Sequence, residues 1–110
     1  MTAPQVQPPA KLLMIVFEAH DEWEGIPLHE ALAQTLEERG IAGATALRGV
    51  SGYGAHHRLR SKGLLEPSHE PMTLLVVDNE AKLRDVVPIL RPMVAEGVFV
   101  LLDAEVMSVS

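Results

Sequence analysis

Short runs of apolar residues recur along the chain with the length and composition of β-strands, at residues 11–17, 72–77 and 98–102. They are almost continuous rather than alternating, which is typical of strands covered on both faces or at the centre of a sheet. A weaker strand is predicted at 43–51, where Thr45, Leu47 and Val50 favour extended backbone but the surrounding alanines and glycines do not. The last strand can run on to Met107.

Two further segments place apolar residues at helical spacing. In the first, Pro27 suits the first turn, where a missing N–H costs nothing, and Gly40 suits the left-handed position that ends a helix. The second begins with Asp78 or Asn79 as its N-cap, and two prolines in its later half predict a kink or an interruption. The apolar positions are Leu28, Ala31, Leu32 and Leu36 in the first helix, and Leu83, Val86, Val87, Leu90 and Val94 in the second.

The predicted order of elements is β-α-β-β-α-β, the ferredoxin-like α+β pattern, in which two helices cover one face of a four-stranded antiparallel sheet. One domain is expected over residues 11–107, after a flexible tail at 1–10 that holds three prolines. Residues 51–70 are expected to form a long loop, and loops of that length are usually functional or disordered. Because the strands are apolar on both sides and the helices cover only one, we expect a homo-oligomer with sheets packed face to face.

Composition narrows the classes of function. The chain has 110 residues and no cysteine, which excludes thiol nucleophiles, iron–sulfur clusters and cysteine zinc sites. It has no apolar run of the roughly 18 residues that a membrane helix needs, and its first ten residues do not resemble a signal peptide, so we expect a cytoplasmic protein. A net charge of −6 argues against nucleic acid as a partner.

The cations are concentrated in one segment. The 27 residues from Arg39 to Leu65 contain no carboxylate but hold five of the nine lysines and arginines: Arg39, Arg48, Arg58, Arg60 and Lys62. A G-x-x-G-x-G run at 49–54 directly follows Arg48. Glycines let backbone N–H groups approach a phosphate, and guanidinium groups can close such an anion site. The segment therefore predicts a phosphate site, although glycine-rich loops with arginines are also common without a ligand.

Histidines provide the alternative of a metal-binding trimer, with candidates in the loop at His56, His57 and His69 and two more at His20 and His29. Adjacent histidines in an extended chain point to opposite faces, and no H-x-x-x-H spacing supports a site, so no bound metal is expected.

The sequence contains no clear catalytic motif either. His20 could act with Glu18 or Asp21 as an acid–base pair. However, roles as solvated surface charges and as a helix cap account for these residues, so we expect that the protein is not an enzyme. Tyr53 can stack on a base or anchor the loop, and Trp23 can cover a helix start or contact a ligand.

Three stretches carry a family resemblance: DEWEGIPLHEA at 21–31, RGIAGATALRGVSGYG at 39–54 and VDNEAKL at 77–83, with Glu96 and Gly97 after the second predicted helix. Over about residues 12–106 the chain resembles the PII-like proteins of domain-of-unknown-function family 190. The resemblance implies a trimer built by packing three sheets, and a long loop between the second and third strands. It also implies a regulatory protein without a required cofactor, which binds a small effector, typically an adenine nucleotide, between subunits.

When positions are matched, the resemblance implies that the ligand is contacted by residues 48–54, where the long loop begins, and by the turn after the second helix. PII proteins have a lysine in that turn that helps to hold a polyphosphate, whereas residues 95–97 contain no cation. We therefore expect the phosphate to contact arginines, and a monophosphate to fit more easily than a triphosphate. The expected ligand-binding residues are Arg48, Gly49, Gly52, Tyr53, Gly54, Arg58, Arg60 and Gly97. A partner protein is implied to dock on the loop at 56–70, with a membrane transporter as one conceivable partner.

Overall fold

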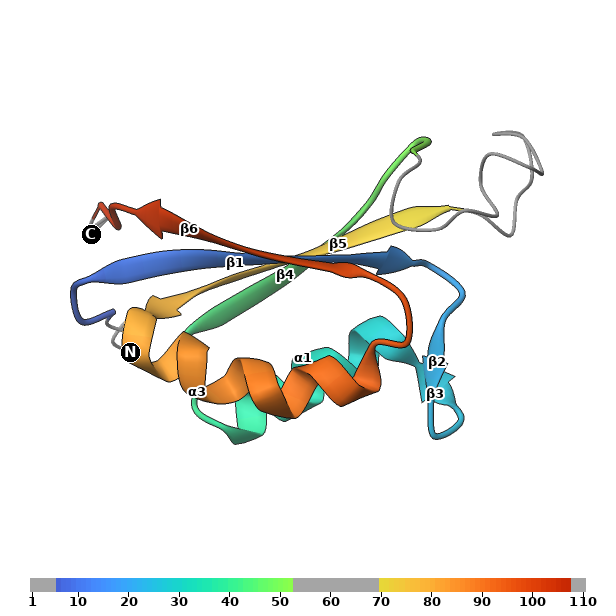
Figure 1. Cartoon of the computed structure of the whole chain (residues 1–110), viewed down its shortest axis with the longest axis horizontal. Helices are drawn as coiled ribbons and strands as arrows, with labels where there is room; N and C mark the ends of the chain where they lie inside the picture. Colours follow the sequence, from blue (N-terminus) through green and yellow to red (C-terminus); the bar gives the residue numbers. More distant parts are fainter. Residues whose placement is uncertain (1–5, 53–69, 108–110) are drawn as a thin grey trace, which may run out of the picture.

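The computed structural model describes residues 6–52 and 70–107. Four strands form an antiparallel sheet in the order β4-β5-β1-β6, and two helices cover one of its faces (Figure 1). The strands are β1 (Ala10–Glu18), β4 (Gly43–Arg48), β5 (Pro71–Asn79) and β6 (Val98–Ala104), and the helices are α1 (Leu28–Glu38) and α3 (Glu80–Leu90). This is the ferredoxin-like arrangement that the sequence predicts, with β6 ending before Met107.

A small hairpin that the sequence analysis does not predict precedes α1. It pairs β2 (Glu22–Trp23) with β3 (Ile26–Pro27), and its two turn residues, Glu24 and Gly25, have φ values of 51° and 87°. Pro27 is the N-cap residue of α1 rather than part of its first turn, and Gly40 has the left-handed φ of 74° expected at the helix end. The hairpin lies on the helix side of the sheet, next to the start of α1 (Figure 1).

Asn79, not Asp78, caps α3. Its Oδ1 accepts hydrogen bonds from the backbone N–H groups of Ala81 at 2.8 Å and Lys82 at 3.4 Å. The α-helix ends at Leu90, and a 3-10 turn, η2 (Arg91–Met93), follows it directly. The interruption predicted from the two prolines is therefore confirmed. The carbonyls of Gln7 and Pro9 accept hydrogen bonds from Asn79 and Glu80, which ties the described part of the expected tail to this junction.

Asp78 is instead buried, with 1% of its surface exposed. Its Oδ2 accepts from the Ala42 N–H at 2.8 Å and lies 3.1 Å from Lys82 Nζ, while Oδ1 accepts from the Asn79 N–H at 2.6 Å. Lys82 Nζ also donates to the Gly40 carbonyl at 2.7 Å. One carboxylate therefore joins the end of β5 to the start of α3 and to the segment between α1 and β4.

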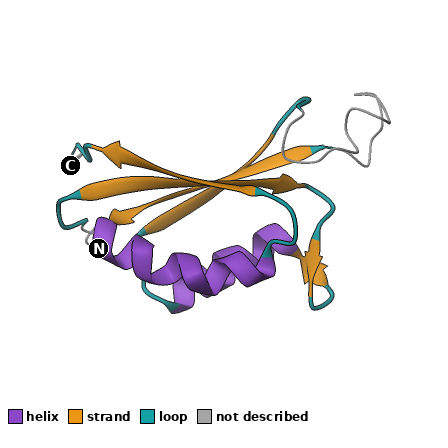
Figure 2. Cartoon of the chain, in the orientation of Figure 1, coloured by secondary structure: helices purple, strands orange, loops and turns teal. Residues whose placement is uncertain are grey.

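The core lies between the sheet and the helices, and its largest fully buried members include Leu13, Ile15 and Phe17 of β1 and Leu74 and Val76 of β5. Helices occupy only one side of the sheet (Figure 2). On the other side the alternate residues of the strands form an uncovered face, on which Val98, Val100 and Leu102 of β6 are about 40% exposed. We call this apolar surface the open sheet face. The further members that the strand register places on it are Leu12, Met14, Val16, Leu75, Val77 and Leu47.

Candidate ligand site at the base of the β4–β5 connection

The expected ligand-binding residues begin where β4 ends. The register pairs Arg48 with Met72, so the chain leaves β4 and enters β5 at the same end of the sheet. Just beyond, the Gly49 N–H donates to the Pro71 carbonyl at 2.8 Å, and the Ala19 N–H donates to the Glu70 carbonyl at 2.8 Å. The ends of β1, β4 and β5 are therefore joined by backbone hydrogen bonds at this point, which we call the loop base.

Three charged or ionisable side chains meet at the loop base. The Oε1 atom of Glu70 lies 3.2 Å from Arg48 Nη1 and 3.6 Å from His20 Nε2. The side chains are all partly exposed, at 57% for Arg48, 59% for His20 and 40% for Glu70. The expectation that the cations of this segment lie apart from acids is wrong for Arg48. The carboxylate is distant in sequence, but pairing of β4 with β5 brings it alongside.

Two of the expected glycines are required by packing. A Cβ added at Gly49 would lie 2.7 Å from Pro71 Cγ, and one added at Gly97 would lie 2.5 Å from the Val16 carbonyl oxygen. Gly97 therefore lets the turn after η2 lie directly against the backbone of β1. A Cβ added at Gly52 would make only ordinary contact, with Pro71 Cγ at 3.7 Å. The structure thus explains Gly97 and Gly49 without a ligand.

Arg48 and Gly97 lie at the same end of the sheet but on its two opposite edge strands. One row of paired residues runs across that end from β4 to β6, through Leu47, Thr73, Val16 and Val98. Three strand spacings correspond to about 14 Å. Within one protomer, Arg48 and the turn at Gly97 are therefore separated by the width of the sheet.

The remaining expected ligand contacts, Tyr53, Gly54, Arg58 and Arg60, lie outside the described residues, as do His56, His57 and His69. In the part of the chain that is described, no group of three or more histidine, aspartate or glutamate side chains could hold a metal ion. Asp21 has a structural role in the turn after β1, since its Oδ2 accepts from the Glu18 N–H at 3.2 Å and its carbonyl accepts from the Leu28 N–H at 2.8 Å.

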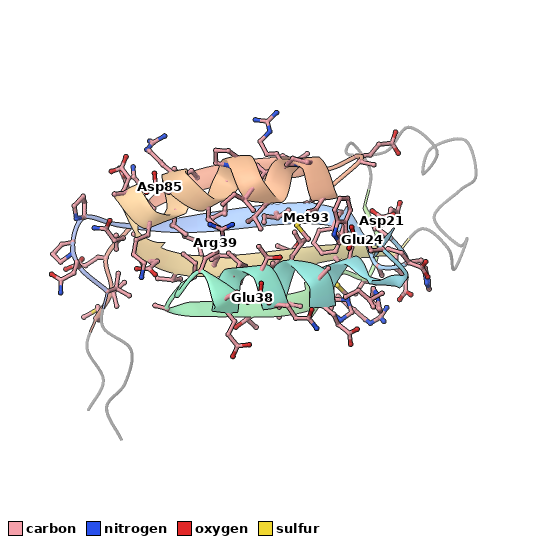
Figure 3. The ribbon with its side chains drawn as sticks, turned by 90° about the horizontal axis from the view of Figure 1, so that it is seen from below. Asp21, Glu24, Glu38, Arg39, Asp85 and Met93 are labelled. Atoms are coloured by element: carbon pink, nitrogen blue, oxygen red, sulfur yellow. The ribbon has the colours of Figure 1, made fainter. Side chains whose placement is uncertain are left out.

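Trp23 is away from the loop base, on the helix side of the molecule. It lines an open hollow of about 220 Å³ between the hairpin, α1 and η2, together with Glu24, Glu38 and Met93 (Figure 3). A second hollow of about 230 Å³ lies between α1 and α3 and is lined by Arg39, Lys82 and Asp85, among others (Figure 3). Among the described residues, none of the helices has the length and hydrophobicity needed to span a membrane.

Comparison with known proteins decides the family. The sequence model of DUF190, described as "Uncharacterized ACR, COG1993", matches residues 10–106. The chain belongs to the DUF190 family. A UPF0166 protein of Aquifex aeolicus is 34% identical to this DUF190 protein over 76 residues, covering 67% of this chain and 72% of the relative. A UPF0166 protein of Methanocaldococcus jannaschii is 28% identical over 98 residues, covering 88% and 91%.

Solved structures place this DUF190 chain among PII-like folds. CPII, a nitrogen regulatory PII-like protein from Thiomonas intermedia K12, superimposes with a TM-score of 0.52 at 22% sequence identity. The match covers 92% of this chain and 94% of CPII, whose structure is described as bound to ADP, AMP and bicarbonate. The similarity confirms the predicted PII-like fold.

Proposed function

We propose that this DUF190 protein is a cytoplasmic PII-like regulatory protein that binds a small phosphorylated effector, an adenine nucleotide, at clefts between the subunits of a homotrimer. It acts by binding rather than by catalysis and needs no further cofactor. The PII-like fold supports this proposal, and CPII, which shares that fold, was solved with ADP and AMP. In the proposal, effector binding alters the connection at 51–70 and so controls a partner protein, for which a membrane transporter is one candidate.

The observation that carries the proposal is the position of Arg48. Its side chain is more than half exposed at the loop base, where an arriving anion can reach it. The turn at Gly97 lies on the opposite edge of the same sheet. In the proposed trimer, the β4 edge of one copy lies next to the β6 edge of another, so that each cleft brings Arg48 and the Gly97 turn of different copies together.

In the proposal, the effector acts by shifting the populations of the conformations of the connection at 51–70. A ligand changes the conformation of the connection only as far as it binds one state better than another, and a few kcal/mol of differential affinity are enough to switch most of the population. Because the turn at 95–97 carries Glu96 and no cation, additional phosphates gain no partner there. We therefore expect AMP or ADP to bind more tightly than ATP.

Isothermal titration with AMP, ADP, ATP and cyclic AMP tests this proposal. Binding of at least one adenine nucleotide is expected, and Arg48→Ala should weaken it by roughly 1.5 to 3 kcal/mol because a charge-assisted contact is lost. Arg84→Ala is the matched control, since Arg84 is also an exposed arginine paired with a glutamate, but lies on α3. Absence of heat with all four nucleotides at high protein concentration would contradict the proposal.

A further inference from the structure

We propose that Glu70 sets the affinity of the loop base for phosphate by occupying Arg48 until the effector displaces it. This inference rests on the proposed function, because it concerns the same site, and it adds a specific competing group. In this role Glu70 lowers the affinity of every anion that binds at Arg48, because each anion has to displace the carboxylate.

The geometry supplies the competing group. Glu70 Oε1 lies 3.2 Å from Nη1 of the Arg48 guanidinium group and 3.6 Å from Nε2 of the His20 imidazole. The backbone holds Glu70 in this place, since its carbonyl accepts from the Ala19 N–H at 2.8 Å and the next residue begins β5. The backbone of Glu70 is therefore held in place, and its carboxylate can reach Arg48 and His20.

Displacement is feasible because the pair is exposed. Ion pairs between solvent-exposed side chains contribute little, so little binding energy is lost when this one opens. A phosphate monoester carries between one and two negative charges near neutral pH and has three acceptor oxygens, so it pairs with a guanidinium group more strongly than one carboxylate does. An uncharged ligand gains nothing from opening the pair.

The variant Glu70→Gln tests whether the Glu70 carboxylate competes with phosphate for Arg48. The substitution preserves size and removes the charge that competes for Arg48 and repels the phosphate. Isothermal titration should show the Kd for AMP falling about two- to fivefold, the range expected for an exposed ion pair. The affinity for adenosine, which has no phosphate, should stay unchanged.

Glu80→Gln is the matched control. Glu80 Oε2 is also paired with an arginine, at 2.7 Å from Arg84 Nε, and the substitution changes net charge by the same amount. Glu80 follows the far end of β5, a nine-residue strand away from Glu70. Its replacement should leave AMP binding as in the wild type. In an Arg48→Ala background, Glu70→Gln should tighten AMP binding less than it does in the wild type.

The outcomes distinguish the two proposals. If the wild type binds AMP but Glu70→Gln leaves the Kd unchanged or raises it, in a protein whose thermal transition shows that it is folded, the role of Glu70 is overturned and the proposed function stands. Equal tightening for AMP and adenosine would also overturn it. If the wild type binds no adenine nucleotide, the proposed function fails and the role of Glu70 fails with it.

Discussion

Among single residues, Asp78 is a buried acid whose polar contacts join three segments of the chain. Its buried carboxylate accepts from two backbone N–H groups and pairs with Lys82, whose side chain is about half exposed. Asp78→Ala would leave the Ala42 and Asn79 N–H groups without these acceptors. Because hydrogen bonds to a charged group stabilise more than neutral ones, we expect the free energy of unfolding to fall by about 2 to 3 kcal/mol.

Urea denaturation measures this loss. Asp85→Ala is the control, because Asp85 is an exposed aspartate on the same helix as Lys82, and its replacement should change stability by less than about 0.5 kcal/mol. Equal unfolding midpoints for Asp78→Ala and the wild type would show that the network around Asp78 contributes nothing to stability.

The residue scale also shows where sequence reasoning stops. Arg48 could be selected as a candidate ligand residue from the glycines that follow it and from the absence of nearby carboxylates in the sequence. The contact with Glu70 could not, because it depends on the register of β4 against β5 across 22 positions. Asp78 was identified only as a possible helix cap, since burial of its carboxylate depends on the segment at Gly40 and Ala42.

At the scale of elements, the turn after η2 is held tightly against β1. A Cβ at Gly97 would clash with the Val16 carbonyl oxygen at 2.5 Å and with Val94 Cγ1 at 2.7 Å. Because β1 is a central strand and cannot easily move, we expect Gly97→Ala to destabilise the protein by about 1 to 3 kcal/mol, as over-packed sites do.

Gly43→Ala is the natural comparison in a denaturation experiment. Nothing lies within 4 Å of the Cβ that it would add on β4, and alanine restricts the unfolded chain more than glycine does. This variant should be as stable as the wild type or slightly more stable. A Gly97→Ala protein that unfolds at the same urea concentration as Gly43→Ala would refute the packing role of Gly97.

Three of the long strands were predictable from their continuous apolar runs, and both helices from their apolar spacing and end signals, whereas β4 gave only a weak signal. The prolines at 88 and 92 indicated a kink or an interruption in the later half of the second helix, and the structure places the change after Leu90. The hairpin of β2 and β3 was not predictable, because its strands have two residues each and its turn places Glu24, a residue other than glycine, at positive φ. Strands of two residues are too short to show an alternation of apolar and polar residues from which they could be predicted.

For the whole molecule, the open sheet face is the feature that most constrains assembly. In the proposed trimer this face packs against two other copies, so a charge placed on it should prevent association while leaving the protomer folded. Val100, at 37% exposure near the middle of β6, is a suitable position. We expect wild-type protein to have three times the 12.0 kDa protomer mass, and Val100→Asp to have the mass of a monomer.

Light scattering after size-exclusion chromatography measures these masses. Ala81→Asp introduces the same charge on the opposite layer, in the first turn of α3, where a negative charge is favourable, and it should leave the assembly intact. A wild-type protein that elutes as a 12.0 kDa monomer at tens of micromolar would contradict the trimer.

In the proposed trimer, the open sheet face would link effector binding to the concentration of the protein. Association of copies stabilises a folded protomer by mass action, so the melting temperature of such an assembly rises with concentration. Below its dissociation constant, separated protomers would retain Arg48 but lose the neighbouring edge that completes each cleft. Titration of a highly diluted sample would then report poor nucleotide recognition from a correctly folded chain, and the cell would have to maintain a threshold expression level for the signal to be read.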